Sequence, residues 1–67
     1  MADLFSPLER LAAARAGVDV ARAALVRTAD HLRYAGLVTV AVQMEEVARL
    51  SIVWDAEIQR AVDNLRS

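Results

Sequence analysis

His31 is the only histidine of the chain, and acidic residues near it provide the groups from which a metal site or a pH-dependent switch is built. Asp30 precedes it, and Glu45 and Glu46 would approach it if the chain reversed direction in between. The competing interpretation is a surface histidine near a helix C-terminus, where the helix dipole favours its cation. Because no Glu-x-x-His pair of the di-iron type occurs, we predict no metal site and no cofactor.

The other acidic and hydroxyl groups do not form a catalytic arrangement. Glu45 and Glu46 are neighbours and would point about 100° apart on a helix. That geometry favours a solvated face over a buried acid–base pair. Ser6 and Ser51 both lie far along the chain from the single histidine. We therefore predict that the chain is not an enzyme.

Three arginines suggest an alternative that involves nucleic acid. Arg15 and Arg22 are seven apart and so share a helix face, with Arg10 flanking them, and together they would form a stripe for phosphate contacts. Glu9 and Asp19 interrupt this stripe, and the net charge is −1 instead of strongly positive. An RNA- or DNA-binding regulator stays an alternative function, but we do not expect nucleic acid as the partner.

The elements that would carry these groups are two long helices. Ser6, Pro7 and Glu9 indicate a helix start, because serine caps, proline suits the first position and glutamate completes a capping box. Helix one should span about residues 7–35. Its apolar residues repeat every seven positions, with a companion row of smaller residues three positions later. The rows are Leu11, Val18, Leu25 and Leu32, and then Ala14, Ala21, Thr28 and Ala35.

The second half of the chain keeps the same repeat over about residues 38–66. Its first five residues are rich in β-branched side chains and would suit a strand. No second strand candidate exists to pair with them, so we predict a helix, with Thr39 as a candidate N-cap. The rows are Leu37, Met44, Ser51, Ile58 and Leu65, and then Val40, Val47, Trp54 and Ala61.

A turn at about residues 35–38 would fold the chain in half. Gly36 can adopt the left-handed conformation that ends a helix. Leu32 and Leu37 stand at the two positions that make the hydrophobic contact of a Schellman cap. The alternative is one continuous helix through Gly36.

Folding at Gly36 sets large residues opposite small ones along the helices. Trp54 falls opposite Ala21, and Ser51 falls opposite Leu25. Trp54 is then a core anchor, or an interface hot spot if its row faces another protein. Ser51 either fixes the register of the helices or bonds the backbone carbonyl of Val47.

Each helix carries more apolar surface than one seam can bury, so we expect association. The predicted fold is all-α, an antiparallel helical hairpin that dimerises into a four-helix bundle. Larger even oligomers and capture by another helical protein remain open. The candidate core and interface residues are Leu11, Val18, Leu25, Leu32, Met44, Val47, Trp54, Ile58 and Leu65.

Composition limits the remaining possibilities. The chain has 67 residues, no cysteine and 57% apolar residues. It has no basic leader, and its longest uncharged run is the 11 residues from Tyr34 to Met44, whereas a membrane span needs about 20. We expect a cytoplasmic protein with no membrane segment. Residues 1–6 should form a short arm, in which Leu4 and Phe5 either staple the helix start or dock on a second subunit.

The predicted function is that of a small non-enzymatic interaction or assembly module. It would act through self-association, as a homodimer or larger even oligomer, and through a helical protein as a further partner. The alternatives are the RNA- or DNA-binding regulator and an accessory subunit of a larger enzyme.

Overall fold

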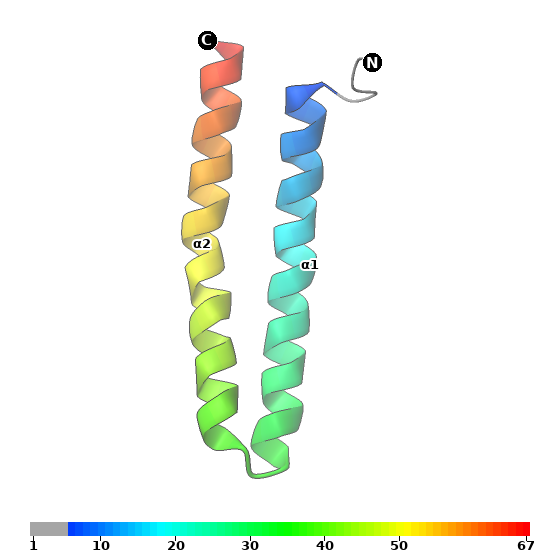
Figure 1. Cartoon of the computed structure of the whole chain (residues 1–67), viewed down its shortest axis with the longest axis vertical. Coiled ribbons are helices and arrows are strands. Elements are labelled where there is room, and N and C mark those ends of the chain that lie inside the picture. The colour runs from blue at the N-terminus through cyan, green and yellow to red at the C-terminus, as the bar shows by residue number, and fades with distance from the viewer. Residues whose placement is uncertain (1–5) are drawn as a thin grey trace.

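The computed structural model describes residues 6–67 and contains two helices, α1 (Pro7–Tyr34) and α2 (Val38–Arg66). They lie side by side and run antiparallel, so the start of α1 and the end of α2 are at the same end of the molecule (Figure 1). The predicted all-α helical hairpin is confirmed. Of the predicted arm, residues 1–5, including Leu4 and Phe5, lie outside the described part of the chain.

The start of α1 is capped by Ser6. Its backbone is extended (φ −67°, ψ 161°), and its hydroxyl accepts a hydrogen bond from the backbone N–H of Glu9 at 3.2 Å. This bond satisfies one of the N–H groups that a first helical turn leaves without a partner. Pro7 occupies the first helical position, where no N–H is needed.

A Schellman cap at Gly36 ends α1 and reverses the chain. Gly36 has a φ of +90°, a conformation that penalises any residue with a Cβ. The N–H of Leu37 donates to the carbonyl of Leu32 at 2.8 Å, and the N–H of Gly36 donates to the carbonyl of Arg33 at 3.1 Å. These two bonds define the motif. The predicted turn is confirmed, and the alternative of a continuous helix through Gly36 is wrong.

The β-branched residues at the start of α2 are helical. Leu37 is the N-cap residue and makes no side-chain capping bond, and Thr39 lies inside the helix rather than at its N-cap. Residues 6–67 contain no strand that could pair with this segment. Of residues 38–42 only Ala41 is buried against α1, so the segment is helical although its β-branched side chains favour extended backbone.

The two helices form a single layer. The molecule measures 48 × 24 × 14 Å, and its shortest dimension is close to the diameter of one helix, about 10–12 Å. Domains usually bury their core between two layers. Here the residues that are buried within the described chain are all small, namely Ala29, Ala41, Ala48 and Ser51.

Candidate interaction surface

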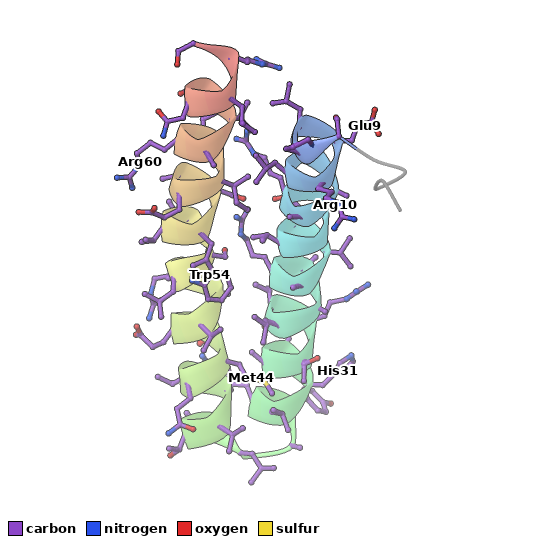
Figure 2. All side chains as sticks on the ribbon, turned by 45° about the horizontal axis from the view of Figure 1, so that its top comes forward. Glu9, Arg10, His31, Met44, Trp54 and Arg60 are labelled. Carbon is purple, nitrogen blue, oxygen red and sulfur yellow. The ribbon has the colours of Figure 1, made fainter. Side chains whose placement is uncertain are left out.

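The seam between α1 and α2 contains the predicted first row of each helix, except for Leu37 and Leu65 at the two ends of the second row, which are exposed. Leu11, Val18, Leu25 and Leu32 are half-buried. On α2 the corresponding half-buried residues include Met44, which Figure 2 shows between the two helices. We define the seam as every described helical residue that is not exposed: Leu11, Val18, Arg22, Leu25, Ala29 and Leu32 on α1, and Ala41, Met44, Glu45, Ala48, Ser51, Asp55, Ile58, Gln59, Ala61 and Val62 on α2.

The second row of the seam differs from the predicted one. On α1 it lies four positions after the leucine row, as Arg22 follows Val18 and Ala29 follows Leu25. The prediction placed it three positions after, and positions three and four residues on lie on opposite sides of the first row. Hydrophobic periodicity does not predict this second row, because on α1 it contains Arg15 and Arg22, which the sequence pattern places in a candidate stripe for phosphate contacts.

The predicted companion rows consequently lie outside the seam, except for Ala61, which is half-buried in it. Ala14, Ala21 and Thr28 are exposed on α1. On α2, Val47 is 39% exposed and Trp54 is 42% exposed. Within one chain Trp54 is therefore not the buried core anchor that one of its two interpretations required. The use of Val47, Trp54 and the half-exposed Leu65 as interface residues stays a prediction.

Arg22 joins the two helices at the middle of the seam. Its Nε donates to Ser51 Oγ at 2.5 Å, and its terminal nitrogen Nη2 donates to Asp55 Oδ2, also at 2.5 Å. Asp19, on the same helix, adds an ion pair with Arg22 at 3.5 Å. The second oxygen of Asp55, Oδ1, is buried without a hydrogen-bond partner among the described residues. Because the Arg22 and Asp55 side chains are largely buried, this pair is held more firmly than an exposed one.

Ser51 also bonds its own helix, but not at the predicted position. Its hydroxyl donates to the backbone carbonyl of Ala48, three residues earlier, at 2.5 Å, whereas we predicted the carbonyl of Val47, four residues earlier. The hydroxyl thus donates to one helix and accepts from Arg22 of the other. A fully satisfied polar group at a buried position favours one register over its neighbours.

Two further cross-helix contacts lie on either side of this cluster. Arg15 donates to Gln59 Oε1 towards the open end, and Arg33 forms an ion pair with Glu45 near the turn. These contacts agree with the predicted register to within one helical turn. They also bear on the nucleic-acid alternative, because Arg15 and Arg22 are engaged with α2 and only Arg10 of the predicted stripe lies away from it (Figure 2).

His31 and the acidic residues do not converge. His31 is exposed on the side of α1 away from α2 (Figure 2). Glu45 pairs with Arg33, Glu46 with Arg49. Within residues 6–67 there is no group of three or more histidine, cysteine, aspartate or glutamate side chains that would hold a metal ion.

The exposed companion rows of the two helices lie on the same side of the hairpin. Each row stands three positions after the leucine row of its helix. In two antiparallel right-handed helices that pack through their leucine rows, residues at this offset lie on the same side of the pair. We call this the Trp54 face. It consists of Ala14, Ala21 and Thr28 on α1 and Val40, Val47 and Trp54 on α2. None of these side chains carries a charge.

The opposite face is more polar and is hollowed between the helices. Val26 and Ile52 stand one position after the leucine rows and line one hollow together with Arg22, Glu45 and Arg49. Residues one position after the leucine row therefore lie on this side of both helices, opposite the Trp54 face. The charged side chains that cross the seam approach from this face, whereas the Trp54 face is left apolar.

Many large apolar side chains are exposed over the whole hairpin, and such exposure indicates a binding surface. Neither described helix combines the length and the apolar character needed to cross a membrane. No family model matches the chain, and no curated protein or solved structure shows significant similarity to it.

Proposed function

We propose that this chain is a small non-enzymatic assembly module whose Trp54 face pairs with the same face of a second copy. The observation that carries the proposal is that the two rows of this face are uncharged along both helices and yet exposed, with Val47 and Trp54 at its centre. Exposing a continuous apolar surface to water is unfavourable, and burying it against another protein surface lowers the free energy.

The size of the core supports the same proposal. The buried residues of the described chain are all small, namely Ala29, Ala41, Ala48 and Ser51, whereas large apolar side chains such as Val47 and Trp54 are exposed. A single layer with an alanine core lacks the second layer that a stable domain needs.

A second copy matches this face better than an unrelated surface does. It presents a layer of the same length and width, made of two helices at the same spacing. Stacking the two layers gives a four-helix bundle, a common closed arrangement for helical hairpins, and a two-fold axis makes the interface self-complementary.

The test uses one matched pair of charge insertions on α2. Val47→Glu places a carboxylate in the Trp54 face, and Val53→Glu places one on the outer side of the same helix, where Val53 is 54% exposed. The masses of the wild type and both variants would be measured by light scattering after size exclusion over a concentration series. We expect the wild type and Val53→Glu to be dimers and Val47→Glu to be monomeric at the same concentration.

Two outcomes would overturn the proposal. One is a wild type that stays monomeric up to its solubility limit, which would leave a helical protein, such as a larger enzyme to which this chain is an accessory, as the partner to seek. The other is co-elution with nucleic acid. It would raise the absorbance of the protein peak at the wavelength where nucleic acid absorbs, and it would be lost as the salt concentration is increased. That result would favour the regulator alternative.

A further inference from the structure

The two helices contribute side chains of different size to the Trp54 face. Its α1 half carries small side chains centred on Ala21, and its α2 half carries large ones centred on Trp54. Arg22 follows Ala21 and bonds both Ser51 and Asp55, which lie on either side of Trp54 along α2, so these two centres are at the same level of the hairpin to within about one helical turn. On this face, a shallow strip of small side chains along α1 therefore lies beside a protruding strip of large side chains along α2.

Two symmetric arrangements bring such a face against itself with the helices aligned. A two-fold axis parallel to the helices lays α2 of each copy on α1 of the other, with both turns at the same end. An axis perpendicular to the helices lays α1 on α1 and α2 on α2, with the turns at opposite ends. The first arrangement sets large residues on small ones, and the second sets large on large and leaves a gap between the small ones.

The charges of the two helices favour the first arrangement. α1 contains five arginines and three acidic residues and has a net charge of +2; α2 contains three arginines and five acidic residues and has a net charge of −2. Laying α2 on the partner's α1 brings opposite net charges together, whereas the second arrangement opposes like charges along both helix pairs.

Residues at the edge of the face agree with this choice. The next row of each helix, further from the seam than the Trp54 face, contains Gly17 and Ala24 on α1 and Leu50 and Glu57 on α2. Leu50 is level with Ala24 along the hairpin, and Glu57 is level with Gly17. In the first arrangement Leu50 would cover Ala24 of the partner, which again sets a large side chain on a small one. Glu57 would lie beside Gly17 of the partner, where no like charge opposes it.

We infer, on the basis of the self-association proposed above, that two copies interlock around a two-fold axis parallel to the helices. Trp54 of each copy sits in the notch at Ala21 of the other, both turns lie at one end, and the four helices alternate in direction around the bundle. The bond geometry of the seam is unchanged by this docking, because Arg22 and Asp55 approach from the opposite face.

An exchange of the two side chains tests the contact. Ala21→Trp opposes two tryptophans at each contact, and Trp54→Ala opposes two alanines, so each variant alone should dimerise more weakly than the wild type. A mixture of the two variants restores large against small at both contacts of a heterodimer. Native mass spectrometry of the mixture should show heterodimer well above its share under random pairing. A random or lower share would overturn the arrangement. Circular dichroism of each variant checks that it is folded.

A distance measurement separates the arrangement from association itself. Because the chain has no cysteine, a spin label can be attached to Tyr34→Cys alone, at an exposed position beside the turn. Double electron–electron resonance should give a short distance between labels, since the turns are neighbours. A distance near the length of α1, about 42 Å, would overturn the arrangement and leave self-association standing. Absence of dipolar coupling at concentrations above the wild-type association range would overturn both.

Discussion

Replacing Gly36 with alanine should destabilise the hairpin, and the same replacement at Gly17 should stabilise it. Gly36 has a φ of +90°, and Gly17 lies inside α1 with helical backbone. A Cβ built on either glycine meets nothing within 4 Å. Steric crowding therefore cannot explain a difference between the two variants, and only the backbone conformation can.

The two effects can be estimated from that conformation. A residue with a Cβ in the left-handed region costs about 1–2 kcal/mol, and part of this is offset because alanine restricts the unfolded chain. We expect Gly36→Ala to lower the free energy of unfolding by about 1 kcal/mol. Gly17→Ala should raise it by about 0.5–1 kcal/mol, because glycine is a poor helix former.

The assay is urea unfolding followed by far-ultraviolet circular dichroism, with all variants at one protein concentration because association would shift the midpoint. Gly36→Asn is the control and should lose less than Gly36→Ala, since asparagine tolerates the left-handed region better. A Gly36→Ala protein as stable as the wild type, or more so, would refute the turn, because that is the behaviour of glycine inside a continuous helix.

Substitutions at Arg22 and Ser6, with Arg49 as a control, test the contacts that stabilise α1. Arg22→Ala should lower the free energy of unfolding by about 1–2 kcal/mol, because Ser51 and Asp55 lose their hydrogen-bond donor. The loss should not be larger, because the Arg22 side chain is a third exposed and solvent screens its charge. The control Arg49→Ala removes only an exposed ion pair within α2 and should change the free energy of unfolding by less than about 0.5 kcal/mol. Equal losses in urea unfolding would contradict the bridging role of Arg22. Ser6→Ala should cost about 1 kcal/mol through loss of the cap to Glu9, and faster amide hydrogen exchange confined to the first turn of α1 would locate that loss.

The local signals in the sequence were sufficient for the hairpin. Ser6 and Pro7 mark the helix start and Gly36 marks the reversal because their chemistry depends on backbone geometry within a few residues. The register of the two helices followed from the turn alone, and the Arg15–Gln59 and Arg33–Glu45 contacts lie where it predicts to within one turn.

The second row of the seam could not be predicted from hydrophobicity. The rows three and four positions from the leucines both lie beside them, and the first is apolar while the second contains Arg22 and Asp55. An apolar row is typical of a core, which is why one of the two interpretations of Trp54 makes it a core anchor opposite Ala21. A long arginine side chain can instead cover the seam with its stem and pair across it, and that outcome depends on an acidic partner 33 residues away.

The order of contacts along the hairpin has a consequence for how quickly it forms. The Arg33–Glu45 pair closes a loop of 12 residues, Arg22–Asp55 one of 33, and Arg15–Gln59 one of 44. Since the entropic cost of loop closure grows only logarithmically with length, each pair nearer the open end adds little once the previous one has formed. We expect the helices to close from Gly36 outward like a zipper, on the microsecond to millisecond scale of local helical folds. The meeting of two chains would then be the slow step, and its rate would rise with protein concentration.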